Sequence, residues 1–253
     1  MTNVLGHRIY YDERDARGVA LRKAAGDVNP HSLELWKKAT LLQPWSVVVD
    51  VGSNYGEMIV DVDYPKSTDI IAFEPNSAIL PYLERTLGEY PHEVELIRSA
   101  VSDIVQADML FARDDSWSGK SSLITEERVD TASDVMVFDT VKVTTLDSEL
   151  GGRGYRDACI KIDVEGAEVS VLRGGAGLLK SLESWAVMLE ILHMPTRVVA
   201  ELVREHFFYL LDKRTGNLIR IHTANPKVLK DVLSSTWIYR QDALLTSHSV
   251  VAL

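Results

Sequence analysis

The sequence predicts an α/β protein built around a doubly wound parallel sheet. Continuous apolar runs at Val47–Val51 and Asp69–Phe73 have the composition of strands that are buried on both faces. A glycine turn, Gly52-Ser-Asn-Tyr-Gly56, follows the first run, and helical patterns separate the later runs. Because strands that alternate with helices form a parallel sheet, we expect a ligand beyond the carboxyl ends of the strands.

The other elements follow in chain order. Asn29-Pro-His-Ser32 precedes a helical pattern at 33–42, which Gln43-Pro44 should end. Thr215-Gly-Asn217 predicts a hairpin between runs at 207–212 and 218–222. Residues 107–125 differ in character and predict only short strand-like pieces. We expect further helices at 80–87, 168–173 and 196–206, and further strands at 93–97, 141–144, 158–162, 185–191 and 242–246.

Length and composition suit one large domain with an extension. The chain has 253 residues, and 46% of them are hydrophobic, which is enough for a sizeable core. We divide it into an N-terminal cap segment at 1–45, partly helical, and a Rossmann-like domain at 46–253. Cys159 is the only cysteine, so no internal disulfide can form.

Charge and hydropathy argue against some partners. The net charge is −10, and no basic cluster with interleaved aromatic residues is present, so we expect no nucleic-acid partner. No stretch reaches the roughly 18 apolar residues of a membrane span, and residues 1–18 are polar and charged rather than a signal peptide. These features predict a cytoplasmic protein and favour an uncharged acceptor over a polyanion. Whether it forms a homo-oligomer stays open.

The glycine turn and a spaced acid predict a nucleoside-containing cofactor. Glu74 ends the second strand, where its carboxylate can accept hydrogen bonds from both ribose hydroxyls. Asp50 replaces the first glycine of a dinucleotide-binding turn, which disfavours a pyrophosphate but suits a ligand with an amino group. S-adenosylmethionine has a ribose, an ammonium and a sulfonium but no phosphate. It is therefore favoured over another nucleotide or none.

A second acidic cluster follows the predicted strand at 158–162. Asp163 and Glu165 precede Gly166, which permits a turn into a helix. This places both acids at the same sheet edge as Gly52 and Glu74, where they either contact a ligand or cap the helix; we favour the ligand. Glu168 falls in the first helical turn, where stabilisation of the helix explains it better.

Six motifs in order resemble the FkbM family of S-adenosylmethionine-dependent methyltransferases. They cover about residues 46–191 and are VDVGSNYG at 49–56, AFEPN at 72–76, SAVSD at 99–103, GKSSL at 119–123, VTTLD at 143–147 and KIDVEGAE at 161–168. The resemblance implies a class I methyltransferase: a Rossmann-like sheet of seven strands, one of them antiparallel, with helices on both faces. It also implies methyl transfer, usually to a hydroxyl of a sugar, glycolipid or secondary metabolite, so the expected partner is a small-molecule or glycosyl acceptor.

The resemblance also implies roles for individual residues. The cofactor side would comprise Asp50, Gly52, Asn54 and Gly56 for the methionine part, Glu74 with Asn76 for the ribose, Ser99, Ala100 and Ser102 for the adenine, and Asp163 near the sulfonium. The acceptor side would include Ser121 and Ser122. Trp117, in the same stretch, is either a lid over the cleft or a packing residue.

Methyl transfer to a hydroxyl also requires a base. His193 follows the strand at 185–191, and an imidazole suits this work, so we expect His193 to be the base with Glu190 beside it, unless it merely caps the helix that follows. Asp163 and Glu165 complete the catalytic set. Asp163, Glu165, Glu190 and His193 have the side chains of a magnesium or manganese site, but their spacing is not diagnostic, and we predict no metal.

Two other functional classes remain open from the sequence. One is a nicotinamide-dependent oxidoreductase, against which Asp50 argues. The other is a nucleoside-binding protein that has the fold but no catalysis, against which the acids at the acceptor side argue.

Overall fold

The computed structural model describes residues 1–123 and 136–250. Its main sheet has eight strands in the order β11-β10-β12-β9-β8-β1-β2-β3. Five neighbouring strands pair in parallel: β1 (Val47–Val51), β2 (Asp69–Phe73), β3 (Val94–Ile97), β8 (Asp157–Ile162) and β9 (Ser184–Glu190). β12 (Ile238–Thr246) pairs antiparallel with both β9 and β10 (Phe207–Asp212), and β11 (Leu218–Ile221) closes the edge as the predicted hairpin partner of β10.

The fold class is confirmed, although the sheet has one strand more than the predicted seven. The extra strand is β11, which pairs with β10 alone and, like β12, runs opposite to the other six strands. The positions of β1 and β2 agree with prediction because their apolar runs are buried throughout, apart from exposed Asp69.

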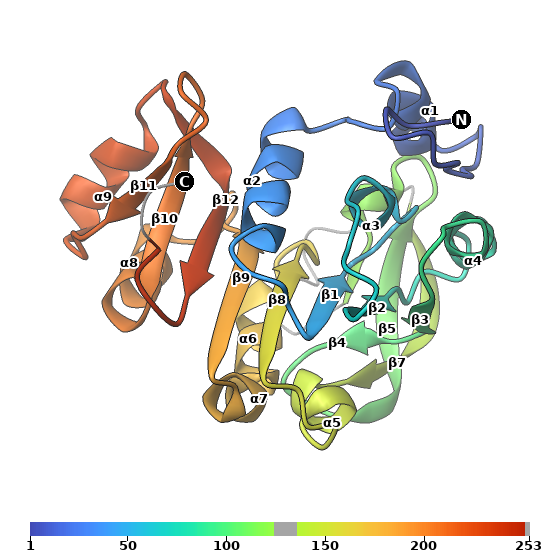
Figure 1. Cartoon of the computed structure of the whole chain (residues 1–253). Helices are drawn as coiled ribbons and strands as arrows, with labels where there is room; N and C mark the ends of the chain where they lie inside the picture. Colours follow the sequence, from blue (N-terminus) through green and yellow to red (C-terminus); the bar gives the residue numbers. More distant parts are fainter. Residues whose placement is uncertain (124–135, 251–253) are drawn as a thin grey trace.

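Helices cover both faces of the main sheet (Figure 1). One face packs against α1 (Ala16–Lys23), α2 (Pro30–Thr40), α3 (Glu57–Val60) and α4 (Leu80–Gly88). The other packs against α5 (Leu146–Leu150), α6 (Glu168–Gly174), α7 (Ala176–Ser181), α8 (Thr196–Glu205) and α9 (Pro226–Leu233). Alternate residues of β1 supply the two cores: Val48 contributes to the first, and Val47, Val49 and Val51 to the second. Among the described residues, no helix is long and apolar enough to cross a membrane.

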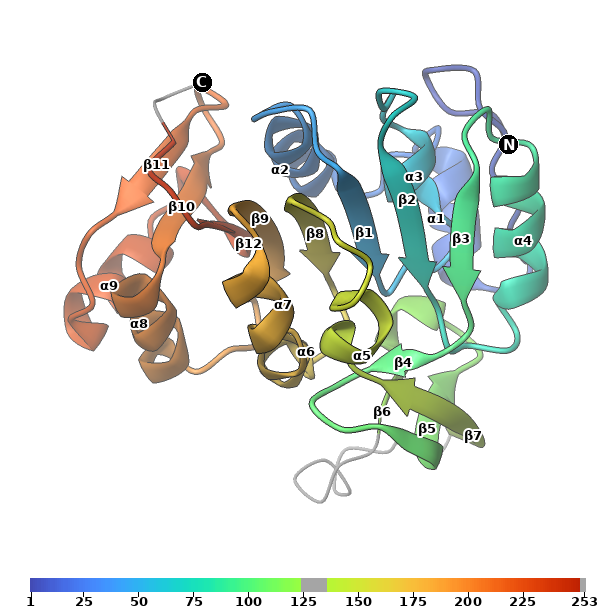
Figure 2. The same cartoon turned by 60° about the horizontal axis from the view of Figure 1, so that its bottom comes forward.

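A second, four-stranded sheet lies beyond the carboxyl ends of β1–β3 (Figure 2). Its order is β4-β7-β5-β6, formed by β4 (Ala100–Val101), β7 (Met136–Thr144), β5 (Gln106–Asp114) and β6 (Ser122–Leu123), with a short 3-10 helix η1 (Ser118–Lys120) before β6. The prediction of only short pieces at 107–125 was wrong for β5, which has nine residues, and residues 124–125 lie outside the described residues. This sheet forms a wall over the strand ends.

Candidate active site

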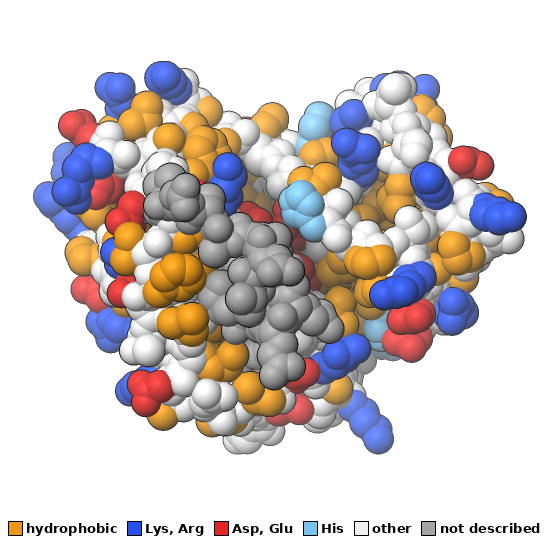
Figure 3. Space-filling view, turned by 180° about the vertical axis from the view of Figure 1, so that it is seen from behind, with side chains coloured by type: hydrophobic (Ala, Val, Ile, Leu, Met, Phe, Trp, Pro, Cys, Tyr) orange, Lys and Arg blue, Asp and Glu red, His pale blue; other side chains and the backbone are white. Residues whose placement is uncertain are grey.

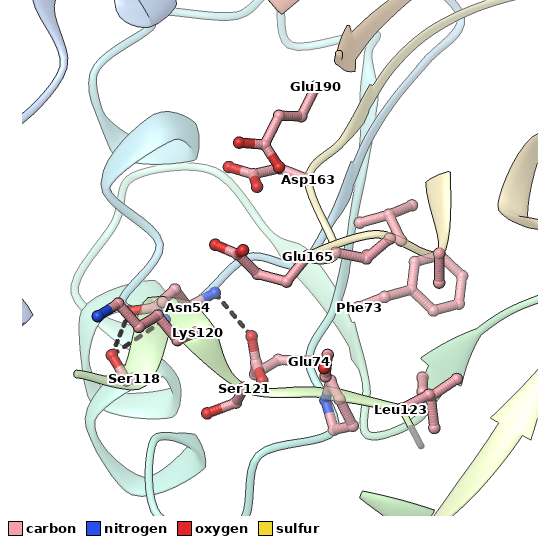
Figure 4. Close-up of a pocket in the computed structure, with 18 of the residues that line it drawn as sticks. Asn54, Phe73, Glu74, Ser118, Lys120, Ser121, Leu123, Asp163, Glu165 and Glu190 are labelled. Atoms are coloured by element: carbon pink, nitrogen blue, oxygen red, sulfur yellow. Dashed lines mark hydrogen bonds between the residues drawn. The ribbon is translucent and has the colours of Figure 1, made fainter. Parts of the chain in front are cut away.

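A cavity of about 540 Å³ lies at the carboxyl ends of the parallel strands, a volume typical of small-molecule sites. Its walls come from the main sheet, the second sheet and the N-terminal segment. Apolar side chains on one side include Phe73 and Leu123, and carboxylates on another are Asp163, Glu165 and Glu190 (Figure 4). Phe111 also lines the cavity.

Strand register sets four predicted residues in one row. Val51 of β1 lies opposite Phe73 of β2 and Ile162 of β8, and Ile162 lies opposite Leu189 of β9. The next residue on each strand is therefore Gly52, Glu74, Asp163 or Glu190. Because the four strands are parallel, these residues leave the sheet at the same edge, as the sequence predicted.

The glycine turn lies in close contact with the residue that follows β8. Gly52 has φ +82°, and a Cβ there would meet the carbonyl oxygen of Asp163 at 2.0 Å, so no larger residue fits without movement of the backbone. Asn54 and Glu165, in the two loops that follow, are non-glycine residues with φ of 48° and 56°. Such backbone conformations are uncommon and cluster at functional sites.

Glu74 is buried and anchors the turn. Its two carboxylate oxygens each accept a backbone N–H at 2.8 Å, one from Asn54 and one from Asn76. Burial raises the pKa of Glu74 to about 7, although the two N–H groups act in the opposite direction. Each oxygen can still accept a second hydrogen bond, so the carboxylate that holds the turn can also bind a ligand.

Asp50 and Gly56 do not line the cavity, and each contacts a neighbouring element of the fold instead. Asp50 is fully buried, and its Oδ1 lies 2.9 Å from Lys161 Nζ on the adjacent strand. Burial lowers the pKa of Lys161, but the Asp50 carboxylate outweighs it and holds the pKa above the usual value. Gly56 has φ +81°, and a Cβ there would meet Leu83 of α4 at 2.9 Å. Both residues therefore shape the turn from behind.

The N-terminal segment supplies part of the cavity wall. Asp15 Oδ2 accepts hydrogen bonds from the hydroxyls of Tyr55 at 2.7 Å and Ser118 at 2.6 Å, and its Oδ1 accepts the backbone N–H of Ser118. Asn54 Nδ2 donates to Ser118 Oγ at 3.2 Å. Arg17, in the first turn of the helix that Asp15 caps, lines the cavity and forms an ion pair with Glu57. One buried carboxylate thus joins the N-terminal segment, the glycine turn and the second sheet.

The carboxylates at the ends of β8 and β9 converge. One oxygen from each of Asp163, Glu165 and Glu190 can be chosen so that all three lie within 4.8 Å of one another. Glu190 is 6% exposed, and burial followed by the charges of Asp163 and Glu165 raises its pKa to about 9. Such a shift at a cavity marks a candidate functional group.

His193 lies at the rim, where its side chain is exposed. In the described part of the chain, no hydrogen bond joins it to Glu190, although both residues line the cavity. β9 ends at Glu190, which points into the cavity, and His193 lies three residues later in the loop before α8. The role of His193 as the base stays a prediction.

Most of the predicted site residues line this one cavity. They are Gly52, Asn54, Glu74, Ser99, Ala100, Trp117, Ser121, Ser122, Asp163, Glu165, Glu190 and His193. The cavity lining does not include Asp50, Gly56, Asn76 and Ser102, although Asn76 Nδ2 reaches Ser121 Oγ at 3.4 Å. Lining residues that the sequence reasoning missed include Arg17, Asn29, Phe111, Ser118 and Gln241. They come from segments without a recognised motif, so no sequence signal distinguished them.

The surface around the site is not basic. Acidic side chains lie in a hollow near the centre of one face, and lysine and arginine side chains occur mainly towards the outline of the molecule (Figure 3). The whole chain carries a net charge of −10.

Fold and cavity together define a class I methyltransferase, and comparison with known proteins agrees. The model of the methyltransferase FkbM domain matches residues 50–217, which is most of the chain. The protein belongs to this family of methyltransferases, and its methyl donor is S-adenosylmethionine. This assignment decides against the nicotinamide-dependent class.

Solved structures resemble the chain only distantly. A methyltransferase from Geobacter sulfurreducens has a TM-score of 0.46 and 12% identity, over 91% of this chain and 85% of that one. The O-methyltransferase TomG from Streptomyces achromogenes, solved with S-adenosylmethionine, has a TM-score of 0.39 and 10% identity, over 94% and 90%. A putative RNA methyltransferase from Pyrococcus horikoshii has a TM-score of 0.40 and 12% identity, over 87% and 82%. No curated protein matches the sequence.

Proposed function

We propose that the protein transfers a methyl group to a hydroxyl of a sugar, glycolipid or secondary metabolite. The observation that carries this proposal is the placement of three carboxylates, Asp163, Glu165 and Glu190, at the strand ends beside the glycine turn. Carboxylates are strong hydrogen-bond acceptors, which suits an acceptor rich in hydroxyl groups. They repel the phosphates of a nucleic acid, and so does the net charge of −10.

The residues around the turn fit the cofactor. Glu74 presents unused acceptor capacity to the cavity and is assigned to the ribose hydroxyls. Gly52 and Asn54 are assigned to the methionine part, with Asp50 and Gly56 holding the turn from behind. Ser99 and Ala100, near the apolar side chains of Phe73 and Leu123, are assigned to the adenine, with Ser102 adjacent.

On the acceptor side, the chain's own residues position a hydroxyl and remove its proton. When bound, S-adenosylmethionine supplies the methyl group and the leaving group. Asp163, with Glu165 and Glu190, orients the acceptor, and holding the reacting oxygen in line is the main contribution expected of the protein. His193, at the rim, accepts the proton that the hydroxyl loses. Trp117, Ser121 and Ser122 contact the rest of the acceptor.

Labelling with methyl-labelled S-adenosylmethionine tests the proposal. The purified chain is incubated with a cell extract separated into small molecules, glycolipids and RNA, and the labelled product is identified. We expect an alkali-stable methyl ether in one of the first two fractions, and less of it with Asp163→Asn. Glu201→Gln, which changes an exposed acid on α8, is the matched control and should label at the parent rate.

Label in RNA, or on nitrogen, would contradict the proposed acceptor. A chain that binds the cofactor but labels no fraction would instead support the non-catalytic alternative. The cytoplasmic location and any homo-oligomer remain separate predictions, tested by fractionation of the source cell and by light scattering.

A further inference from the structure

Three carboxylates share a small volume at the acceptor side of the cavity. Asp163 follows β8, Glu165 lies two residues later with φ 56°, and Glu190 is the last residue of β9. Each offers one oxygen, and these oxygens lie within 4.8 Å of one another. Figure 4 shows the Glu190 and Asp163 carboxylates pointing toward each other, with Glu165 nearby. Like charges at this separation repel, so an ionised cluster needs compensation.

Glu190 gives a second, separate observation. Its side chain is 6% exposed and points into the cluster, and it has no hydrogen-bond partner in the part of the chain that the structure describes. Buried carboxylates normally have such partners. The neighbouring acids do: Glu168 accepts the Gly166 N–H at 2.7 Å, and Asp242 accepts the Ser32 hydroxyl at 2.5 Å.

The nearby lysine is engaged elsewhere. Lys161 Nζ lies 2.9 Å from Asp50 Oδ1 and 3.2 Å from the carbonyl oxygen of Gly52. Its distance to Asp163 Oδ2 is 3.8 Å, which is the longest of the three. Lys161 therefore pairs first with Asp50, and Arg17, which also lies near Asp163, forms its ion pair with Glu57.

We propose that Asp163, Glu165 and Glu190 bind one divalent cation of the magnesium or manganese kind. Hard oxygen ligands suit these ions, and three carboxylates leave coordination positions for water or for oxygens of an acceptor.

The role of the ion rests on the proposed function. A cation held by these three side chains would supply positive charge next to the acceptor hydroxyl and would make its proton easier to remove, with His193 as the proposed base. Binding of the ion itself depends only on the three side chains, and it can be measured without an acceptor.

Manganese binding to the full chain tests the site directly. Electron paramagnetic resonance follows free Mn²⁺ during titration, first without and then with saturating S-adenosylmethionine, and Mg²⁺ is added as competitor. We expect one Mn²⁺ per chain in both conditions, displaced by excess Mg²⁺. Glu190→Gln and Asp163→Asn should each weaken binding at least about tenfold, which is the loss reported even for outer-shell partners of metal sites. Glu201→Gln is the control and should bind as the parent does.

Several results would overturn the inference. Absence of stoichiometric Mn²⁺ binding by the folded parent chain does so, and so does parent-like binding by both cluster variants, which places the ion elsewhere. Circular dichroism checks that each variant is folded, and two variants guard against loss of one. Displacement of Mn²⁺ by S-adenosylmethionine would make the cluster a counter-charge for the sulfonium.

The two proposals fail separately. If Mn²⁺ binds but no methyl ether forms, the proposed function fails and the cation site stands. If the ether forms at the parent rate in excess chelator, the proposed function stands and the role of the ion is refuted.

Discussion

Glu74→Gln is the sharpest test of the cofactor side. The substitution keeps the size of the side chain but removes its charge and one of its two acceptor oxygens. In the parent, each oxygen accepts a backbone N–H at 2.8 Å, from Asn54 or Asn76, and each has room for a ribose hydroxyl. In the variant, the new amide NH2 faces a backbone donor and can no longer accept a hydrogen bond from a ribose hydroxyl, so both the turn and the ribose lose an acceptor.

The expected loss follows from these bonds. A hydrogen bond to a charged group contributes about 1.5–3 kcal/mol, so loss of one ribose contact should weaken S-adenosylmethionine binding about 10- to 150-fold. The unpaired backbone N–H costs a further 1–3 kcal/mol or so, which acts on the free energy of unfolding in the absence of ligand.

Calorimetric titration with S-adenosylmethionine, at pH 8 and at pH 6, measures the effect. The pKa of Glu74 is raised to about 7, so the ionised fraction falls roughly tenfold between these pH values if ribose binding requires the carboxylate. Parent affinity should therefore weaken as pH falls, whereas affinity of Glu74→Gln should stay nearly flat.

Asp69→Asn is the matched control, because Asp69 lies exposed at the amino end of the same strand. Its contact with the Tyr155 hydroxyl, at 3.0 Å, survives the substitution. Unchanged affinity of Glu74→Gln at pH 8 would remove Glu74 from the ribose site, and a parent affinity without pH dependence would show that its ionisation does not matter.

Three further predictions concern the rest of the site. Asp15→Asn should lower the free energy of unfolding in urea by about 1–3 kcal/mol, because the new amide cannot accept from Ser118 and Tyr55 as the carboxylate does. His193→Ala should lower kcat about 10²- to 10⁴-fold for the acceptor found by labelling, with partial recovery at high pH and unchanged cofactor affinity. Burial raises the pKa of Asp242 to about 7, so its carboxyl group binds a proton more tightly in the folded chain than in the unfolded chain. The free energy of unfolding should therefore fall as pH rises from 5 to 8, and it should fall less in Asp242→Asn.

Each of these has a clear contrary result. An Asp15→Asn chain as stable as the parent would mean that its hydrogen bonds contribute nothing net. Parent-like turnover of His193→Ala across the pH range would transfer the base role to another group. If the free energies of unfolding of Asp242→Asn and the parent change equally with pH, ionisation of Asp242 does not contribute to the pH dependence of stability.

The parallel core was predictable because its signal is local. Val47–Val51 and Asp69–Phe73 are apolar runs bounded by turn residues, and their length and burial agree with prediction. Parallel strands of similar length end together, so Glu74 and Asp163 were expected at one edge before their separation was known.

Other features depend on contacts that no local pattern encodes. β7 begins at Met136, five residues before the predicted start, because Phe138 and other exposed residues there pair with β5 without an apolar alternation. Asp15 contacts Ser118 across 103 positions, and Arg17 reaches the cavity from a helix whose sequence has no motif. Glu190 was predicted from its place at a strand end, but the direction of its side chain, towards Asp163 in the cavity, required coordinates.

The contact between Gly52 and the carbonyl of Asp163 has a consequence for protein engineering. The turn assigned to the cofactor and the loop assigned to the acceptor touch through backbone atoms, so neither can be exchanged with a relative's segment as an independent module. A library that randomises the loop after β8 would mostly yield chains with impaired cofactor affinity. Trp117, Leu192 and Gln241 line the same cavity from other segments. We therefore expect substitutions at these three positions to change the acceptor preference with less effect on cofactor binding.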